Sequence, residues 1–274
     1  MHDLHLAVWQ TAYAPPETDT AEALRRLDAA ADQARAQGAE LLVGTEMGLT
    51  GYAIGPERVA ALAEPTNGHL AQAVAAIAQR HGLAIVYGYP ERHPEGGKPF
   101  NAAQCIGADG APLMNYRKTH LFGDMDRAQF SAGDAASQVF TWRGWRLGLL
   151  ICYDVEFPEA VRALALQGAD AVLVPTANML GYDEVPQLLL PARAYENRVA
   201  LAYANACGDE GGLHYGGLST VVQANGTVLA QAARDTTLVL ASLLATDAEK
   251  ARIGSPLPDR RPDLYTALAN RPGH

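Results

Sequence analysis

The chain has 274 residues, of which 49% are hydrophobic and 19% charged, so its composition is that of a globular protein with ample material for a core. Its formal net charge of -9, with no local cluster of Lys and Arg, argues against a nucleic-acid-binding surface. No apolar run reaches the roughly 18 residues that a membrane-spanning helix needs, so no membrane contact is expected.

Hydrophobic periodicity divides the chain into strands and helices. A strand is predicted at residues 4–9, and a helix follows from about Asp19, where Asp19 and Glu22 resemble a capping box, to a cap at Gly38. Further strands are predicted at residues 40–44, 83–89, 101–106, 112–116, 138–142, 145–152, 169–175, 199–206, 218–223, 227–231 and 237–243. Further helices are predicted at residues 68–81, 158–167 and 185–197.

The order of these elements favours an α/β fold in which helices cover sheets. Strands and helices alternate in the first half of the chain and again between residues 152 and 206. The predicted hairpins at residues 101–116 and 218–231 fit a purely parallel, doubly wound sheet poorly. Because there is no low-complexity linker and no internal repeat, we expect a single domain over residues 1–274, with an extended C-terminal tail at about 255–274.

The N-terminus and the cysteines bear on the compartment and on metal binding. The segment MHDLHLAVWQ lacks the basic region and the long apolar stretch of a secretory signal. Cys105, Cys152 and Cys207 are few, odd in number and without CxxC spacing, which predicts neither a disulfide framework nor a zinc site. A reducing cytoplasm is therefore the expected location.

Three predicted strands end in reactive side chains: Glu46 in GTEMGLTGY, Lys118 in YRKTHLF and Cys152 in LLICYDVEFPE. Ligands of α/β folds gather beyond the carboxyl ends of strands, so these groups can converge. An attacking thiol, a carboxylate that takes its proton and an ammonium that stabilises an oxyanion are the parts of acyl transfer through a thioester. Taken singly, the two charges are more simply explained as solvated and the cysteine as a packing residue.

The three segments GTEMGLTGY, YRKTHLFGDMD and LLICYDVEFPE, in this order, resemble the signature segments of the nitrilase superfamily, the carbon–nitrogen hydrolases. The resemblance runs over residues 4–243. It implies a four-layer αββα sandwich and a catalytic triad of Glu46, Lys118 and Cys152. It also implies that the backbone N–H of Tyr153 joins Lys118 in the oxyanion hole. No metal or organic cofactor is implied.

Members of this family often hold a second carboxylate in the site, and here the resemblance points to Asp126. Family members generally have Glu at this position, so the chain departs from the pattern in side-chain length. Asp124 is a competing choice, and a solvated loop acid is the alternative for either. Next to the nucleophile, Asp154 and Glu156 would disfavour a thiolate if they faced it, so we expect both to point away.

Two further residues are candidate substrate contacts. Asn178 lies in PTANM, which follows another predicted strand and, by the resemblance, borders the substrate; an Asn that caps a turn is the alternative. Tyr52 lies in the loop of Glu46 and is a candidate pocket wall, although a Tyr is more often a core residue.

The resemblance implies an amidase that acts on a small-molecule amide, closest in pattern to amidases of short aliphatic or ω-amino amides, such as 5-aminopentanamidase, and to stereoselective amidases. A nitrilase and an N-carbamoyl-amine hydrolase share the triad and are the alternatives within the superfamily. An acyl transferase remains open, because any nucleophile in the pocket can intercept a thioester. A non-catalytic binding protein on the same fold is the alternative from another class.

A homodimer or a higher homo-oligomer is expected, because carbon–nitrogen hydrolases commonly associate around the helix that follows the nucleophile. On that helix, Val161, Leu164 and Ala165 form an apolar stripe, which faces either a partner or the chain's own sheet. The tail at residues 255–265 has three prolines and few apolar residues, so packing across a neighbouring subunit would order it.

Overall fold

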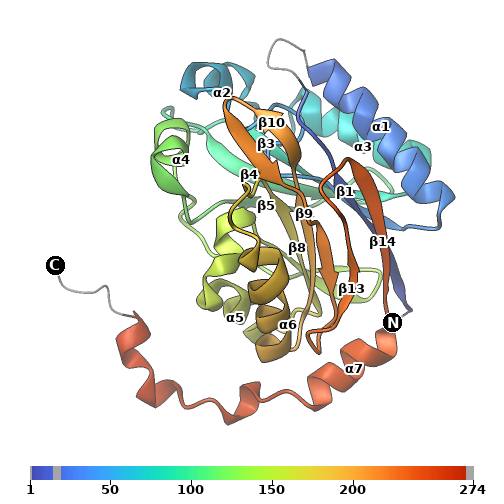
Figure 1. Ribbon diagram of the computed structural model, residues 1–274, viewed down its shortest axis with the longest axis vertical. Coiled ribbons are helices and arrows are strands. Elements are labelled where there is room, and N and C mark those ends of the chain that lie inside the picture. The colour runs from blue at the N-terminus through green and yellow to red at the C-terminus, as the bar shows by residue number, and fades with distance from the viewer. Residues whose placement is uncertain (1, 15–19, 270–274) are drawn as a thin grey trace.

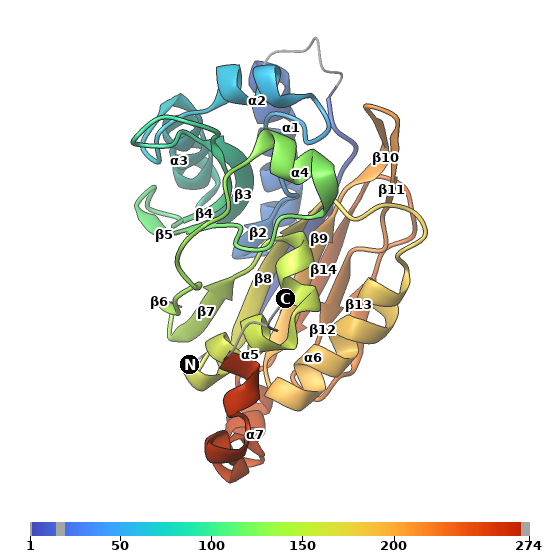
Figure 2. The ribbon, with the colours of Figure 1, turned by 90° about the vertical axis from the view of Figure 1, so that its left-hand side faces the viewer.

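Two six-stranded sheets stack face to face, and helices cover the outer face of each sheet (Figures 1 and 2). The computed structural model describes residues 2–14 and 20–269. These four layers confirm the predicted αββα sandwich. The predicted helix cap at Asp19 lies outside the described residues.

The first sheet combines parallel and antiparallel strands. Its order is β14 (Thr237–Leu243), β1 (Leu4–Gln10), β2 (Leu41–Val43), β3 (Ala84–Glu91), β4 (Phe100–Ile106) and β5 (Pro112–Arg117). Strands β1, β2 and β3 run parallel to one another, and β4 and β5 add an antiparallel hairpin. Strand β5 therefore points the same way as β2, and their carboxyl ends lie at the same edge of the sheet.

The second sheet repeats this arrangement. Its order is β13 (Val228–Gln231), β12 (Thr220–Val222), β9 (Ala200–Asn205), β8 (Ala171–Thr176), β7 (Trp145–Leu149) and β6 (Phe140–Trp142). Strands β7, β8 and β9 are parallel and form its centre. A separate hairpin of β10 (Cys207–Glu210) and β11 (Leu213–Gly216) extends from β9.

Strand β1 has hydrophobic residues on both of its faces, and both faces are buried. Leu6 and Val8 face the core between the sheets, whereas Ala7 and Trp9 face a second core under the outer helices. The helices α1 (Thr20–Ala36) and α3 (His69–His81) close that second core. On the opposite side, α5 (Pro158–Leu166) and α6 (Leu190–Asn197) cover the second sheet (Figure 1).

The structure departs from the sequence predictions in several short elements. The strand predicted to end at Cys152 ends at Leu149, and a short 3₁₀ helix, Cys152–Glu156, carries the cysteine instead. The helix predicted over residues 185–197 begins as a π-helical turn, Val185–Leu189. The sequence analysis missed α2 (Pro56–Leu62), α4 (Gly123–Gln129), α7 (Ala245–Ile253) and the hairpin of β10 and β11. These elements are short or largely exposed, so their hydrophobic periodicity is weak.

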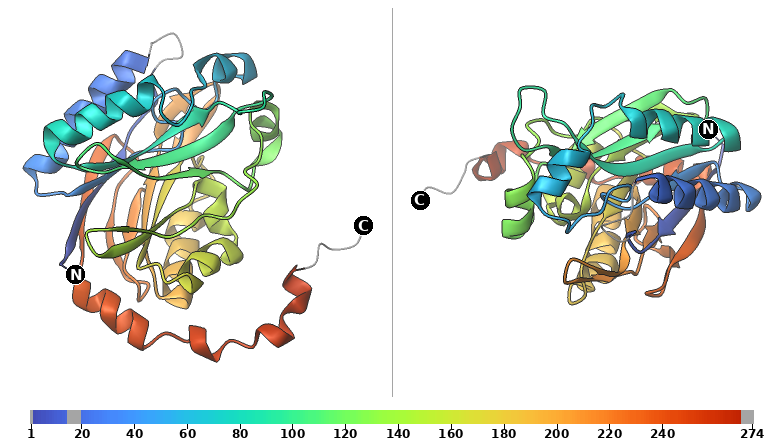
Figure 3. Two further views of the ribbon diagram at one scale, coloured as in Figure 1. Left: turned by 180° about the vertical axis from the view of Figure 1, so that it is seen from behind. Right: turned by 90° about the horizontal axis from the view of Figure 1, so that it is seen from above.

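The C-terminal part of the described chain forms an arm. After α7, the short turns Leu257–Asp259, Pro262–Leu264 and Thr266–Ala269 lead past α5 and α6 rather than into the sandwich (Figures 1 and 3). Ile253, Leu264 and Tyr265 are exposed along the arm. No helix within residues 2–14 and 20–269 is long and apolar enough to cross a membrane.

Candidate active site

Glu46, Lys118 and Cys152 come together beyond the carboxyl ends of β2, β5 and β7. Lys118 Nζ lies 2.8 Å from Glu46 Oε1, and the charges of both side chains act on the Cys152 thiol. The first sheet supplies the carboxylate and the ammonium, whereas the second sheet supplies the thiol. The sandwich therefore brings three positions far apart in the sequence to a single site.

A tight turn after β2 fixes the position of Glu46. The backbone carbonyl of Glu46 accepts a hydrogen bond of 2.7 Å from Tyr13 Oη, and the side chain is fully buried. Gly88 of β3 allows the turn to pass close to the sheet. A Cβ at that glycine would lie 2.7 Å from the carbonyl oxygen of Thr45 and 2.9 Å from the carbonyl carbon of Glu46. Any larger residue at this position would push the carboxylate out of place.

Lys118 is held at both its main chain and its side chain. Its backbone N–H donates to the carbonyl of Asn101, 2.8 Å away, which continues the pairing of β4 and β5. Its Nζ donates to Glu46 and to Asp126 Oδ2, the latter at 2.7 Å, and the side chain is fully buried. A buried ammonium between two carboxylates is strongly positioned, because its removal leaves two buried carboxylates without a cation.

Cys152 stands on a strained turn. Its φ of 47° lies in the left-handed region that non-glycine residues rarely adopt. Asp154 stabilises the turn, since its backbone N–H donates to Ile151 O at 3.0 Å and its Oδ2 accepts from Ile151 N at 3.1 Å. The sulfur is thus presented by a clamped turn beyond β7 rather than by the strand itself.

The electrostatics keep the resting thiol protonated. Burial raises the pKa of Cys152 well above its usual value, and the charge of Glu46 raises it further, whereas Lys118 and the backbone N–H of Ala177 act against this. Burial also raises the pKa of Glu46, against the opposing effect of Lys118. A thiolate here therefore requires transfer of the proton to a base.

The two acids proposed as the second carboxylate are placed very differently. Asp126 is fully buried; its Oδ2 accepts from Lys118 and its Oδ1 accepts from Tyr52 Oη at 2.7 Å. Asp124 is fully exposed, and its closest ion-pair partner is Arg127 at 3.7 Å. Asp126 thus binds the side chains of Lys118 and Tyr52 without lining the pocket over Cys152. A shorter side chain than Glu reaches the lysine because α4, which the sequence analysis missed, brings it close.

A tight pocket with a cavity volume of about 10 Å³ lies over Cys152. Of the predicted substrate contacts, Tyr52, Tyr153 and Asn178 line it, whereas Asp126 does not. The side-chain amide of Asn178 also donates to the carbonyl of Tyr182 at 3.1 Å, so this residue both borders the pocket and stabilises a turn. The pocket is completed by Phe122, Glu156, Ala177, Met179 and Tyr182.

The expectation that both acids next to the nucleophile point away is half right. Asp154 points into the structure, where it accepts hydrogen bonds from Tyr116 Oη, Thr119 Oγ1 and the backbone N–H of His120, each at 3.0 Å. Glu156 instead lines the pocket. The difference arises because the 3₁₀ turn directs side chains two positions apart to different sides, which a prediction of a strand followed by a loop does not specify.

Sequence reasoning missed Asn101 as a site residue. Its Nδ2 donates to Glu46 Oε1 at 2.6 Å, so it fixes the carboxylate oxygen that also contacts Lys118. Glu46 Oε2, by contrast, has no hydrogen-bond partner among the residues that the structure describes. The sequence does contain one indication of this role. Asn101 is a polar residue at the start of a predicted buried strand, and a buried polar side chain needs a hydrogen-bond partner.

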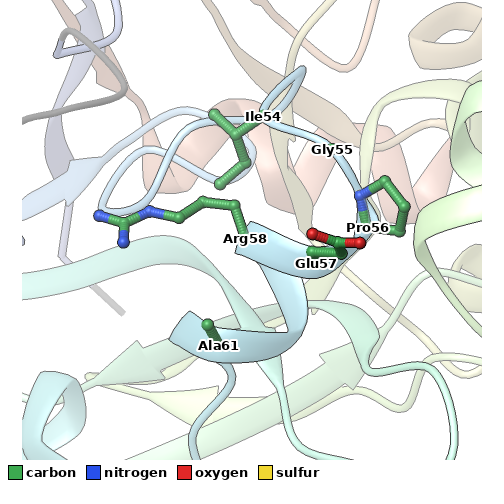
Figure 4. Close-up of a pocket in the computed structure, with 6 residues that line it drawn as sticks. All are labelled: Ile54, Gly55, Pro56, Glu57, Arg58 and Ala61. Carbon is green, nitrogen blue, oxygen red and sulfur yellow. The ribbon is translucent and has the colours of Figure 1, made fainter.

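Other features lie outside this site. A surface pocket at α2, lined by Ile54, Gly55, Pro56, Glu57, Arg58 and Ala61 (Figure 4), shares no residue with the pocket over Cys152. Cys105 and Cys207 are buried free thiols in β4 and β10. Within the described parts of the chain, no group of three His, Cys, Asp or Glu residues is arranged to hold a metal ion.

Comparisons with known proteins agree on one family. The model of the carbon–nitrogen hydrolase family matches residues 5–253. A Pseudomonas protegens protein described as a hydrolase in the pqqF 5′ region is 48% identical over 94% of this chain and 90% of its own length. An (R)-stereoselective amidase of a Pseudomonas species is 40% identical over 72% of this chain and 70% of its own.

The solved structures agree with these relatives. The crystal structure of an amidase from Nesterenkonia sp. superposes with a TM-score of 0.83 at 36% identity, covering 97% of this chain and 96% of that one. The family match, the amidase relatives and the shared fold lead to one conclusion: the chain belongs to the carbon–nitrogen hydrolases of the nitrilase superfamily and is a C–N hydrolase.

Proposed function

We propose that this enzyme is an amidase that hydrolyses a small aliphatic amide, including ω-amino amides, to the acid and ammonia through a thioester on Cys152. The observation that carries the proposal is the buried contact of Lys118 with Glu46 beside the thiol, with Glu46 Oε2 left unpaired. The small volume of the pocket supports a small acyl group. The tests are the active-site substitutions argued in the Discussion, with ammonia release as the readout.

In the first half of the reaction, Cys152 Sγ attacks the amide carbonyl carbon while Glu46 takes the thiol proton. The developing oxyanion is stabilised by Lys118 Nζ and the backbone N–H of Tyr153. The C–N bond then breaks, the proton passes from Glu46 to the leaving nitrogen, and ammonia departs. Asp126 and Asn101 keep the lysine and the glutamate in position during these steps.

In the second half, water attacks the thioester carbonyl while Glu46 again acts as the base. The C–S bond breaks, the acid leaves and Cys152 regains its proton. A relative supports the choice of a cysteine as the nucleophile: in a variant of the Nesterenkonia amidase, the active-site cysteine carries the acetamide moiety of fluoroacetamide.

Nitriles, carbamoyl compounds and acyl transfer are the alternatives to amide hydrolysis. The same triad serves all of them, and a relative from Arabidopsis thaliana is an N-carbamoylputrescine amidase. The amidases among the relatives favour the amide. Parallel assays of ammonia release from amides, nitriles and carbamoyl amines, with and without hydroxylamine as a competing acceptor, separate these reactions.

The pH profile tests the role of Glu46. The base must be ionised, and burial raises its pKa, so kcat/KM for a neutral amide is expected to fall on acidification with a midpoint above the ordinary Glu value of about 4.3. Repeating the profile with Glu156→Gln separates Glu46 from the other carboxylate near the thiol. Loss of the acid limb in that variant, or full wild-type activity below the ordinary Glu value, would contradict this assignment.

We place the enzyme in the cytoplasm as part of the same proposal. Cys105, Cys152 and Cys207 are all free thiols, and the proposed chemistry requires the second of them to stay reduced.

A homo-oligomer is proposed on the face formed by α5, α6 and the C-terminal arm. The stripe of Val161, Leu164 and Ala165 does not contribute, because it is buried against the chain's own sheet. Leu166 and Tyr195, exposed by 51% and 57%, instead project from this face. They line a groove of about 1000 Å³ that the arm borders. The volume and apolar lining of the groove support its occupation by a second copy of the chain.

Light scattering at micromolar protein concentration is expected to give the mass of a dimer or a multiple of it. Leu166→Glu and Tyr195→Glu place charges in the proposed interface and should shift the mass to the monomer. Leu188→Glu serves as the control, because Leu188 is a more exposed leucine that does not line the groove. A monomer mass for the wild-type protein would exclude the assembly.

A further inference from the structure

The hairpin of β10 and β11 carries a buried carboxylate that the proposed mechanism does not use. Glu210, the last residue of β10, is only 6% exposed. Its Oε2 accepts hydrogen bonds from the backbone N–H groups of Ala53 and Tyr52, at 2.7 Å and 3.0 Å. The same oxygen accepts from Tyr215 Oη at 3.0 Å. The carboxylate is therefore bound to the main chain of the loop that carries Tyr52.

A negative charge at this place is costly to the fold. Burial raises the pKa of Glu210 because it disfavours the charged form, and the hydrogen bonds from Ala53, Tyr215 and Tyr52 oppose this effect. A neutral side chain could fill the same space without the cost of burying a charge. A charged acceptor, however, binds N–H groups about twice as strongly as a neutral one. The carboxylate is thus suited to holding the loop firmly in place.

Two glycines allow the hairpin and the loop to approach each other closely. Gly51 has a φ of 94°, and a Cβ at this residue would lie 2.5 Å from Glu210 Oε1. Gly211 has a φ of 57°, and a Cβ there would collide with the carbonyl oxygen of Ala53. A side chain at either position would push the two segments apart. The contact between Glu210 and the loop therefore depends on both glycines.

Tyr52 is held at its main chain and at its side chain. Glu210 accepts from its N–H, Gln129 Nε2 donates to its carbonyl oxygen at 3.0 Å, and its hydroxyl donates to Asp126 Oδ1 at 2.7 Å. Gln129 and Asp126 both belong to α4, so Tyr52 connects that helix with the hairpin. The ring of Tyr52 also lies 5.7 Å from Lys118 Nζ. Two separate elements thus place the tyrosine beside the lysine.

A series of contacts continues from Tyr52 to the reacting atoms. Asp126 binds the tyrosine hydroxyl with one oxygen and accepts from Lys118 Nζ with the other, at 2.7 Å. The charge of Lys118 acts in turn on the Cys152 thiol. Tyr52, Asp126 and Lys118 are all buried. Because buried side chains are closely packed, a shift of the tyrosine main chain would also move the ammonium.

We infer that Glu210 is a positioning residue for the proposed reaction. Its carboxylate fixes the main chain of Tyr52, and the hydroxyl of that tyrosine orients Asp126. Asp126 then keeps the ammonium of Lys118 where the oxyanion develops. This inference rests on the proposed amidase function. Glu210 does not line the pocket over Cys152, so it acts on the reaction only through these neighbours.

A double-mutant cycle of Glu210→Gln and Tyr52→Phe tests the inference. Glu210→Gln keeps the shape of the side chain and removes its charge, whereas Tyr52→Phe breaks the contact with Asp126. Steady-state kinetics with hexanamide is expected to show a loss of about 10–100-fold in kcat for Glu210→Gln alone. In the Tyr52→Phe background the same substitution should change kcat by less than about threefold, because the connection is already broken.

The cycle distinguishes positioning from a purely structural role. Equal effects of Glu210→Gln on kcat in the two backgrounds would overturn the inference. Tyr52→Phe alone should also lower kcat by about 10-fold or more. A folded Tyr52→Phe protein with wild-type kcat would overturn the inference whether or not the Glu210 variant folds.

Asp170→Asn is the matched control for the loss of a buried charge. The carboxylate of Asp170 is also buried and accepts from the backbone N–H of Arg146 at 3.0 Å. Asp170 precedes β8, however, and so lies at the edge of the second sheet opposite the active site. This variant should lower the midpoint of thermal unfolding and keep kcat within about twofold of the wild-type value. A loss of kcat as large as that of Glu210→Gln would count against positioning.

Alkylation of Cys152 by iodoacetamide gives a readout that does not depend on the substrate. The charge of Lys118 lowers the pKa of the thiol, so displacement of the ammonium should slow alkylation by about 10-fold in Glu210→Gln and in Tyr52→Phe. Wild-type alkylation rates in both variants would overturn the inference. If the wild-type protein releases ammonia from no amide, the proposed function fails, and the alkylation rates still decide whether Glu210 positions the site.

Discussion

Cys152→Ala is expected to abolish amide hydrolysis while leaving the fold intact. The substitution removes the atom that forms the proposed thioester, and no other cysteine lines the pocket, so kcat should fall by at least about 10⁴-fold. Loss of one sulfur atom costs on the order of 1 kcal/mol of stability, as for a small core truncation. Ammonia release and a thermal unfolding curve measure the two effects.

Cys207→Ala is the matched control for the loss of a thiol. Cys207 is a buried free cysteine in β10, outside the pocket, and its sulfur lies 3.5 Å from Thr236 Oγ1. The control variant should keep wild-type turnover. If a folded Cys152→Ala protein retains a substantial fraction of the activity, Cys152 is not the nucleophile.

Glu46→Gln and Lys118→Met are expected to impair the chemical step more than substrate binding. Loss of a general base typically lowers the rate by ~10²–10⁴-fold. Loss of one oxyanion donor typically lowers it by ~10²–10³-fold. Both effects should appear in kcat, because the two groups act in the transition state and are buried beneath the pocket. Steady-state kinetics over a range of amide concentrations separates kcat from KM.

Stability needs its own control in the lysine variant. Lys118→Met leaves Glu46 and Asp126 as two buried like charges without a cation, which destabilises a protein by about 3–5 kcal/mol. The double variant Lys118→Met/Asp126→Asn removes one of those charges and should recover stability without recovering turnover. Asp124→Asn removes an exposed acid from the same helix and should leave both properties unchanged. Mild changes confined to KM in both single variants would refute the triad.

The sequence predicted the convergence of Glu46, Lys118 and Cys152 better than the local structure around them. Glu46 and Lys118 follow short strands whose apolar runs are readable, and the positions just beyond such strands are fixed by the sheet. Cys152 was placed on the strand itself because Leu150 and Ile151 continue the apolar run. The strand ends earlier because Asp154 folds back onto Ile151 and binds residues far away in the chain, including Tyr116. Contacts between residues far apart in the chain leave no pattern in the local sequence.

The orientation of Glu156 and the role of Asn101 could not be predicted for a related reason. The path of the turn that carries Glu156 depends on contacts from distant parts of the chain, here the hydrogen bond from Arg193 to the backbone carbonyl of Glu156. The contact of Asn101 with Glu46 depends on the pairing of β4 with its neighbours in the sheet. Likewise, the apolar stripe of α5 fits a partner or a sheet equally well by sequence, and only the packing shows that it is buried.

Mass spectrometry of the acyl-enzyme is the most direct test of the proposed thioester. The wild-type protein is mixed with hexanamide, stopped with acid during turnover, and measured intact and after digestion. We predict a mass increase equal to one hexanoyl group, located on the peptide that contains Cys152, absent in Cys152→Ala and removed by hydroxylamine. Turnover without acylation of Cys152, under conditions where hydrolysis of the thioester limits the rate, or acylation at another residue, would contradict the mechanism.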